Sequence, residues 1–411
     1  MTRRVVVTGL GVVSSIGIGK DDFWPNLIAG KSGISAITSF NTSEFSTHNG
    51  GEIKNLDHRI FLDKSSGQKI GRASCLAIGA AKLGVKDAGL DLEKLDKDRI
   101  GVCVGTTMGE SQVVEEINLA WVFKGLDAID VELIPKYPAN VLAANVAKEL
   151  DLSGPNMVIP NACAAGNYAI GWAYDLIRSG DADFMFAGGT DAFSKIAFIG
   201  FNRLLAVAPQ ICQPFDKNRR GMMVGEGAGI LVLESYDSAL KRGAQIYAEV
   251  LGYGLSCDAH HMTAPQAEGI KEAIEKSLKF SGISPEDVSY LNAHGTGTAA
   301  NDREECAAIK KVFGERYKKL PVSSIKSMLG HTMGAASAIE AIACCLAIKN
   351  NIIPPTINYE TPNPDCDIDC VPNVARKIKV NIALNSSSAF GGNNACLVLK
   401  KVNDGKQFSK I

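Results

Sequence analysis

The sequence has little net charge, few histidines and no long apolar runs. Its 43 Lys and Arg residues nearly balance 44 Asp and Glu residues, which argues against nucleic acid as a general partner. No apolar run approaches the roughly 18 residues that a membrane span needs, and the best candidate, residues 338–348, is interrupted by Glu340. The N-terminal apolar run lacks the core of a signal peptide and indicates a β-strand. We therefore expect a cytoplasmic protein with no membrane span.

The eleven cysteines show no regular spacing. An odd number of cysteines in a long chain indicates reduced thiols in a cytoplasm rather than disulfides. Cys366 and Cys370 form a C-x₃-C pair, but no second pair of ligands lies nearby, so we predict no metal site. The chain is 46% hydrophobic and 21% charged, an ordinary globular composition. Its length allows two large domains or one fused pair.

One cysteine lies in a setting that suits a nucleophile. Cys163 follows an apolar run that ends at Pro160, and its turn of small residues opens an apolar helix that ends near Gly180. A helix without a polar face must be buried. Free N–H groups and the helix dipole at its start favour a thiolate. The alternative is a buried structural cysteine, since free cysteine is among the most buried residue types.

A glycine-rich stretch near the N-terminus invites comparison with a dinucleotide-binding loop. The strand predicted at residues 5–8 runs into Gly9 and Gly11. The third glycine of G-x-G-x-x-G would fall at Ser14, and no acidic residue is suitably placed downstream. We therefore predict a buried strand followed by a glycine turn.

The order of predicted elements in the first half of the chain repeats in the second. Gly89 and Gly282 each end a predicted helix, and Gly105 and Gly295 each follow the next strand. Both pairs are separated by nearly the same number of residues. In the first half, the region between Gly105 and Pro138 has a less regular pattern of apolar residues. Two copies of one α/β unit predict a pseudo-twofold protein with its site at the junction.

Three glycine-rich turns of the second half follow predicted strands and carry His294, Lys326 with His331, and Phe390. Glycines let a substrate approach the backbone closely, and sites in open α/β sheets form at the carboxyl ends of strands. The other four histidines, His261 among them, are interpreted as structural or exposed. Either turn histidine alone could be a satisfied core residue. Together with a cysteine at a helix start they favour a functional interpretation.

These motifs together resemble the condensing enzymes of the thiolase superfamily, specifically the β-ketoacyl-acyl-carrier-protein (ACP) synthases of the I/II type. The similar segments span essentially the whole chain and include NACAAG, NAHGTGT, VSSIKSMLGHTMGA, MVGEGAGILVLE and FGGNN. The resemblance implies an α/β protein with the thiolase-like five-layered αβαβα fold. Its two pseudo-twofold-related halves would be residues 1–246, with the nucleophilic cysteine, and 247–411, with the two histidines.

Two neighbouring families fit the turns less well. A degradative thiolase would need a second catalytic cysteine in the C-terminal glycine turn, where this chain has Phe390. An initiating synthase would carry Asn in place of His331. A nicotinamide dehydrogenase, suggested only by Gly9 and Gly11, is remote.

The resemblance implies a reaction in two stages. A cysteine thiolate accepts an acyl group from a carrier thioester. A malonyl-type extender then loses CO₂, and its enolate attacks the acyl-enzyme, which lengthens the chain by two carbons. Negative charge on the thioester oxygen must be met by fixed donors. No bound cofactor is implied, because the substrates arrive on the phosphopantetheine arm of an acyl carrier protein.

The resemblance also assigns the catalytic roles. His294 and His331 would donate hydrogen bonds through Nε2 during decarboxylation, and the backbone N–H groups of Cys163 and Phe390 would hold the acyl oxyanion. Phe390 would also gate access to the cysteine.

A buried lysine needs a partner, and Lys326, together with Glu305, would hold the histidine network. The substrate-binding positions implied by the resemblance are Met108, Phe201, Thr296, Thr298 and Gly391. Of these, the two threonines would contact the pantetheine arm. Met108 would line the acyl pocket, unless it simply packs in the core.

Some positions depart from the common family pattern. Ala389 precedes the gating phenylalanine where glycine is common, and Ala299 replaces a usual proline. The run 301–305 looks somewhat like type II polyketide ketosynthases. The catalytic set is intact, but two pathways stay open: fatty acid elongation, or a specialised polyketide or polyene route with a chain-length-factor partner.

An acidic carrier protein would need a basic rim, for which the candidates are Lys64, Lys69, Arg72 and Arg203, although isolated surface charges are usually just solvated. We also expect a homodimer, or a heterodimer with a chain-length-factor-like subunit. Such subunits are non-catalytic and typically lack the cysteine, so Cys163 and the two turn histidines favour an active enzyme.

Overall fold

The computed structural model describes residues 2–64 and 70–402. Within them the main sheet runs in the order β11-β10-β14-β15-β9-β1-β8-β7-β5-β6, with β2 (Gly17–Ile18) paired to β1. The first half of the chain contributes β1 (Val5–Ser14), β5 (Ile100–Gly105), β6 (Asn156–Ile159), β7 (Phe184–Asp191) and β8 (Gly227–Ser235). The second half contributes β9 (Ala248–Cys257), β10 (Tyr290–Asn292), β11 (Val322–Ser323), β14 (Ile382–Ser388) and β15 (Asn393–Lys400).

The strand order is symmetric about the β1–β9 contact. In the first half, β6, β5 and β7 run parallel, and β8 and β1 follow antiparallel. In the second half, β11, β10 and β14 run parallel, and β15 and β9 follow antiparallel. The halves meet where Val5 pairs with Val250. This confirms the predicted pseudo-twofold architecture.

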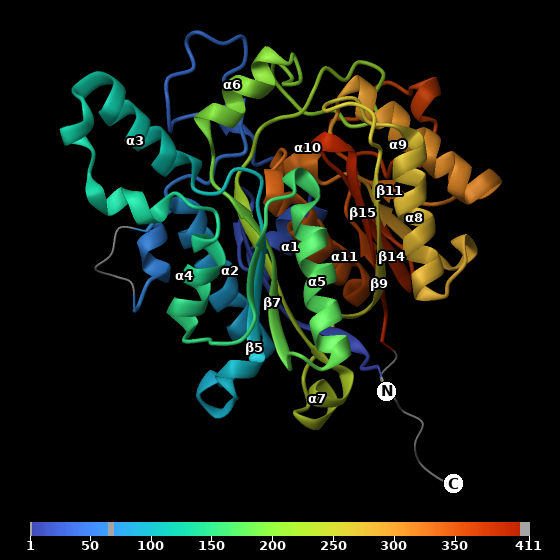
Figure 1. The fold of residues 1–411 in the computed structure, drawn as a ribbon. Coiled ribbons are helices and arrows are strands. Elements are labelled where there is room, and N and C mark those ends of the chain that lie inside the picture. Colours follow the sequence, from blue (N-terminus) through green and yellow to red (C-terminus); the bar gives the residue numbers. More distant parts are fainter. Residues whose placement is uncertain (1, 65–69, 403–411) are drawn as a thin grey trace.

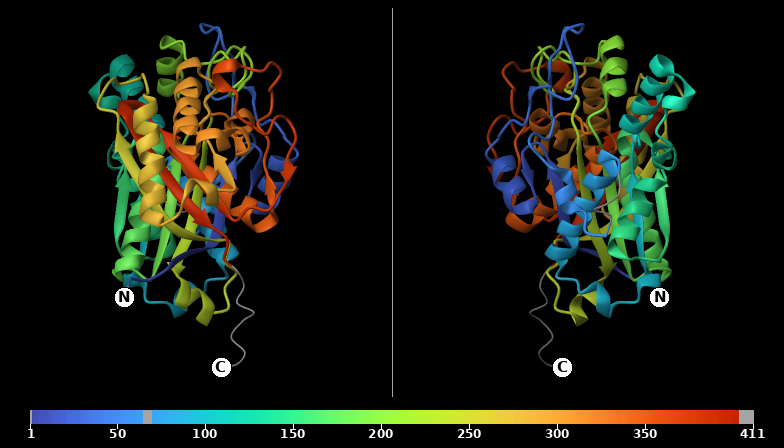
Figure 2. Two further views of the ribbon diagram at one scale, coloured as in Figure 1. Left: turned by 90° about the vertical axis from the view of Figure 1, so that its right-hand side faces the viewer. Right: turned by 90° about the vertical axis from the view of Figure 1, so that its left-hand side faces the viewer.

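Helices cover both outer faces of the two half-sheets and fill the space between them (Figures 1 and 2). The first half-sheet carries α2 (Arg72–Ala88) and α4 (Val141–Leu150) on its outside. The second half-sheet carries α8 (Ala267–Ser281) and α9 (Ala299–Phe313). Between them lie α5 (Ala165–Ser179) and α11 (Ala336–Asn350). The five layers are the αβαβα arrangement expected from the resemblance.

The central helix corrects one prediction. Residues Met333–Asn350 have a mean hydropathy of 1.3 and are long and apolar enough to cross a membrane, although we expected no such run. In this structure 89% of that segment is buried. It is the core helix against which both half-sheets pack.

The glycine turn predicted after residue 8 is also wrong, because β1 continues to Ser14. A Cβ atom on Gly11 would lie 1.7 Å from the carbonyl oxygen of Ala80, and one on Gly9 would lie 2.5 Å from that of Gly84. These glycines therefore allow the backbone of α2 to lie directly on the strand.

The region described as less regular contains a helix, α3 (Ser111–Lys124), which protrudes from one side of the molecule (Figure 1). The pattern of apolar residues did not predict this helix, because α3 has no apolar stripe: Trp121, Val122 and Phe123 are all exposed. The remaining helices and small strands are α1 (Lys20–Ile28), α6 (Lys195–Arg203), α7 (Tyr236–Lys241), α10 (Lys326–Leu329), β3 (Ser35–Ala36), β4 (Asn49–Gly50), β12 (Ile352–Ile353) and β13 (Arg376–Lys377).

Candidate active site

Cys163 lies at the junction of the two halves, in the 3₁₀ turn η6 (Ala162–Ala164) that opens α5. Only 7% of its surface is exposed. Burial raises the pKa of the Cys163 thiol to about 12, although the nearby Lys326 charge lowers it. From the position of Cys163 at a helix start alone, we predicted that its ionised form would be favoured. Desolvation therefore outweighs the helix dipole and favours the protonated thiol in this buried setting.

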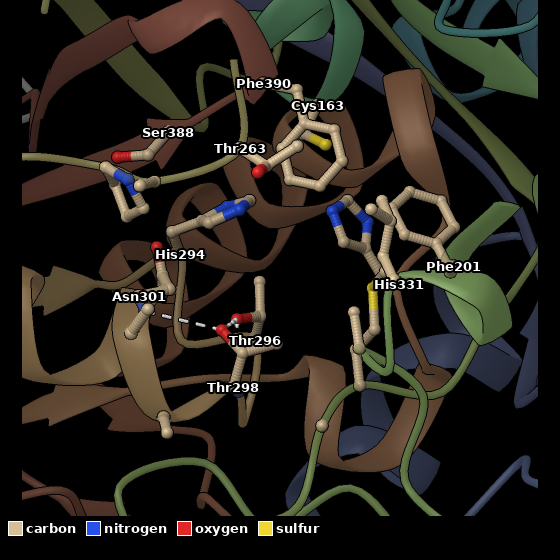
Figure 3. A pocket seen from close by; sticks show the side chains of 18 of the residues that line it. Cys163, Phe201, Thr263, His294, Thr296, Thr298, Asn301, His331, Ser388 and Phe390 are labelled. Atoms are coloured by element: carbon tan, nitrogen blue, oxygen red, sulfur yellow. Dashed lines mark hydrogen bonds between the residues drawn. The ribbon is translucent and has the colours of Figure 1, made fainter. Parts of the chain in front are cut away.

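His294 and His331 lie beside Cys163 (Figure 3), with their ring centroids 5.3 Å apart and the rings nearly perpendicular. Their nearest nitrogens and Sγ of Cys163 lie within 4.8 Å of one another. Burial and the Lys326 charge hold the pKa of both histidines well below the usual value. The structure therefore brings together the three predicted residues as a thiol and two neutral imidazoles.

The tautomer of His331 follows from one hydrogen bond. The backbone N–H of Met333 donates to Nδ1 of His331 over 3.1 Å. A neutral imidazole that accepts at Nδ1 carries its hydrogen on Nε2. His331 therefore presents a hydrogen-bond donor. Nδ1 of His294 is buried with no partner among the described residues.

The same three residues have a spacing that could hold a metal ion. A metal would need the lone pair of Nε2, which would move the hydrogen of His331 to Nδ1. That hydrogen would then face the N–H of Met333. The donor set therefore fits a hydrogen-bonding site better than a metal centre.

Lys326 begins α10 and is fully buried. Its Nζ donates to the carbonyl oxygen of His294 over 2.7 Å and forms an ion pair with Glu340 of α11. The counter-charge of Lys326 is therefore Glu340 and not Glu305. Glu305 instead accepts hydrogen bonds from the N–H groups of His294 (2.7 Å) and Gly295 (2.8 Å), so it holds the same turn from its other side.

The sequence did carry a signal for Glu340. It is the one charge in the apolar run 338–348, and a buried charge requires a partner. Burial raises the pKa of Glu340 despite the Lys326 charge, and it raises the pKa of Glu305 to about 7.

Phe390 follows β14, in the turn η11 (Phe390–Gly392). Its ring packs on Phe201 with the centroids 5.6 Å apart, as Figure 3 shows near Cys163. Gly391 has φ +82°, a conformation that favours glycine. Just before this turn, Oγ of Ser387 donates to the carbonyl oxygen of Cys163 over 3.2 Å. Phe390, the predicted gate, and Cys163, the predicted nucleophile, therefore lie close together at the same cavity.

A cavity of about 350 Å³ leads to this cluster. Of the predicted site residues, those that line it are Cys163, His294, His331, Phe201, Phe390, Thr296 and Thr298. The two threonine hydroxyls lie 2.9 Å apart. Met108 and Gly391 are not among its lining residues. Lining residues that were not predicted as site residues include Leu204, Leu205, Arg220, Met222, His261, Met262, Thr263, Asn301 and Ser388.

His261 had been interpreted as structural or exposed, but it borders the cavity. Its Nδ1 accepts hydrogen bonds from the N–H groups of Thr263 (3.1 Å) and Ala264 (3.2 Å). The ring is therefore held by its own turn, at the wall of the site.

The candidate basic rim is only partly available. Arg72 is tied to the buried Glu226 by an ion pair of 2.7 Å, so it is not free to bind a partner. Lys64 is exposed, 3.7 Å from Asp151, and Lys69 lies outside the described residues. Arg203 is exposed at the end of α6, next to the cavity residue Leu204.

Sequence comparisons agree with this site. The family "Beta-ketoacyl synthase, N-terminal domain" matches residues 2–239, and "Beta-ketoacyl synthase, C-terminal domain" matches residues 247–360. The chain is 42% identical to a 3-oxoacyl-[acyl-carrier-protein] synthase 2 of Synechocystis sp. over 408 residues, covering 97% of this chain and 98% of that protein. It is 43% identical over 407 residues to the enzyme of that name from Staphylococcus aureus, with the same coverage.

Solved structures extend the likeness. The ishigamide ketosynthase/chain length factor aligns with a TM-score of 0.95 and 45% identity, covering 98% of this chain and all of that one. A type II polyketide acyl-carrier protein in complex with its ketosynthase bound to the hexaketide aligns with a TM-score of 0.91 and 37% identity, with the same coverage. With matches over nearly its whole length, the chain belongs to the β-ketoacyl synthase family of condensing acyltransferases.

Proposed function

We propose that this chain lengthens an acyl chain by two carbons in a decarboxylative condensation between an acyl group on Cys163 and a malonyl group on an acyl carrier protein. The observation that carries the proposal is the buried cluster of one thiol and two neutral imidazoles, with Nε2–H of His331 set by Met333. Such a cluster offers a nucleophile and fixed donors in a water-poor site.

The first stage loads the enzyme. Sγ of Cys163 forms a bond to the thioester carbon, and the bond from that carbon to the carrier sulfur breaks. The thiol proton leaves with the carrier thiol. The N–H groups of Cys163 and Phe390 hold the oxyanion that forms during this transfer.

The second stage makes the carbon–carbon bond. The malonyl group loses CO₂, and the electron pair of the broken bond forms an enolate. Its oxygen is held by Nε2–H of His294 and His331. The enolate carbon then attacks the acyl carbon on Cys163, whose thiolate leaves, and the β-ketoacyl product stays on the carrier. Lys326 and Glu305 keep His294 in place from its carbonyl and amide sides.

We propose fatty acid elongation as the pathway, in keeping with the 3-oxoacyl synthases at 42–43% identity. A specialised polyketide or polyene ketosynthase is the second candidate. The 45% identity to the ishigamide ketosynthase/chain length factor specifically favours it. The acyl chains that load onto Cys163 would separate the two pathways.

We further propose that the enzyme pairs with a second subunit of its own fold, either a copy of itself or a chain-length factor. Two surfaces support this. β6 ends the sheet with its outer edge unpaired among the described residues, and Met157 on it is exposed. The apolar side chains of α3 are exposed as well. Free edges and apolar patches of this kind mark interaction surfaces.

The acyl carrier protein is proposed to dock at the mouth of the cavity, where Arg203 and Arg220 are exposed beside Leu205. Met108 and Gly391 stay proposed substrate contacts that only an occupied site would reveal. We also propose a cytoplasmic location, since all eleven cysteines are free thiols, and a division into halves 1–246 and 247–411.

Intact-mass analysis with acyl-carrier thioesters of several lengths tests the reaction. We expect one acyl adduct on the wild type, none on Cys163→Ala, and a ketoacyl product after malonyl-ACP is added. Absence of an adduct with every thioester would argue for a non-catalytic subunit. Repeating the assay after co-expression with a candidate chain-length factor would show whether loading depends on a partner.

A further inference from the structure

Asp191 is a buried carboxylate beside the reactive cluster. It is the last residue of β7 and has no exposed surface. Oδ1 accepts hydrogen bonds from Oγ1 of Thr106 (2.6 Å) and the N–H of Met108 (2.9 Å). Oδ2 accepts from the N–H groups of Thr107 (2.8 Å) and Gly334 (2.6 Å). Four donors therefore converge on one side chain, and only an ionised carboxylate accepts them all without offering a donor of its own.

The four donors come from two turns in different halves of the protein. Residues 106–108 follow β5 and include Met108, the proposed acyl-pocket residue. Gly334 lies in the turn η9 (Met333–Ala335), between His331 and α11. The two turns touch, since a Cβ atom on Gly334 would lie 2.4 Å from Cα of Thr106. Asp191 thus joins the first half of the site to the second.

The bond to Gly334 is one residue from the bond that orients His331. Met333 has φ +53°, a conformation that L-residues rarely adopt, and its N–H donates to Nδ1 of His331. A strained turn keeps its shape only where neighbouring contacts over-determine it. The hydrogen bond from Gly334 to Asp191 is such a contact.

Asp191 also acts on the nucleophile through its charge. Charged and titratable groups around Cys163 are His294, His331, Lys326, Glu340 and Asp191. The Lys326 charge lowers the pKa of Cys163, whereas burial and the Asp191 and Glu340 charges raise it. Burial raises the pKa of Asp191 itself to about 6, although its four hydrogen bonds lower it, so the carboxyl is mostly ionised at neutral pH.

We propose that Asp191 is a positioning residue that couples the turn at residues 106–108 to the turn that orients His331. This inference rests on the proposed condensation. It predicts that loss of the carboxylate slows the decarboxylation stage much more than the acyl-transfer stage.

Asp191→Asn keeps the shape of the side chain but removes the charge and leaves too few acceptors for four donors. Decarboxylation of malonyl-ACP, which needs Nε2–H of His331, should fall at least tenfold. Acyl transfer to Cys163 should be kept, because it does not use Nε2–H of His331. A parallel fall of both rates would mean a merely structural role and would overturn the proposal.

Asp216→Asn is the matched control. Asp216 is also fully buried and accepts hydrogen bonds from the N–H groups of Asn218 (2.7 Å), Glu360 (2.7 Å) and Thr361 (2.6 Å), none of which belongs to the turns at residues 106–108 or 333–335. It should leave the ratio of the two rates unchanged.

Thr106→Val covers the case in which Asp191→Asn does not fold. It removes one donor in the first half and should still slow decarboxylation of malonyl-ACP by threefold or more with no acyl group present. An unchanged rate would refute the coupling. If the wild type catalyses neither stage, the proposed function fails, and the ¹⁵N chemical shifts of the His331 ring, which report its tautomer, then test Asp191 alone. A changed tautomer in Asp191→Asn supports the inference, and unchanged ring shifts overturn it.

Discussion

Lys326 and Glu340 form an ion pair in the middle of the protein, where α10 meets the most apolar helix of the chain. The lysine Nζ uses a second hydrogen bond to hold the carbonyl oxygen of His294. One charged pair therefore links the core helix to a histidine of the active site. This link explains why an apolar helix carries a glutamate, and it leads to the first prediction.

Glu340→Gln should destabilise the protein by about 3 kcal/mol, because it leaves the Lys326 charge buried without a counter-charge. Urea denaturation at pH 7.5 measures the change in the free energy of unfolding. Glu304→Gln is the control, since its side chain is partly exposed and forms its ion pair with the surface residue Arg303. A glutamine oxygen can still accept the hydrogen bond that the N–H of Ala267 donates to Glu304 over 3.3 Å, so the change should alter stability by less than about 1 kcal/mol. Equal effects would contradict the role given to the buried pair.

The stability of the protein should fall with rising pH in a way that depends on Glu305. Burial raises the folded-state pKa of this residue from 4.5 to about 7. A raised carboxyl pKa favours the folded state below pH 4.5, and this contribution is lost as the pH rises through 7. Two to three pKa units correspond to about 3 kcal/mol. Comparing urea midpoints at pH 5 and pH 8, we expect a smaller decrease for Glu305→Gln than for wild type.

Removal of the His331 donor should affect decarboxylation selectively. His331→Leu should slow CO₂ release from malonyl-ACP by about 10²–10³-fold, the usual effect of deleting one oxyanion donor. His331→Asn keeps an N–H group and should retain more activity. Acyl loading of Cys163, followed by intact mass, should continue in both variants. Normal CO₂ release by His331→Leu would refute the donor role.

A substitution at Ala389, the residue before Phe390, tests whether Phe390 acts as a gate. Its backbone is extended, with φ −132° and ψ 158°, so the turn does not require glycine. Ala389→Gly should cost at most about 1 kcal/mol and should let Phe390 move more freely. We expect a broader range of acyl lengths loaded onto Cys163. A distribution identical to that of the wild type would show that the Cβ of Ala389 does not restrict the gate.

Much of the site could be read from local sequence. Cys163, His294 and His331 lie in short turns whose glycines and small residues follow predicted strands, and the chemistry of a thiol with two imidazoles is specific. The resemblance added the oxyanion and substrate positions. The repeat of elements predicted the two halves, because each copy has the same apolar pattern.

Some features could not be read from local sequence. Gly9 and Gly11 looked like a turn, and only the approach of α2 revealed them as a packing surface inside a strand. The counter-charge of Lys326 could not be read from the family motifs, because Glu340 lies outside them and reaches the lysine from another helix, α11. The role of Asp191 depends on donors from two turns that are more than two hundred residues apart along the chain.

The sequence by itself determined the family, the order of the elements and the identity of the reactive groups, since these depend on residue type and spacing. Only the tertiary structure decided which charges pair, which tautomer His331 adopts and how strongly burial raises the pKa of Cys163. Those properties arise from distances between groups that are remote in the chain and from the exclusion of water. Neither quantity exists until the two halves have packed together.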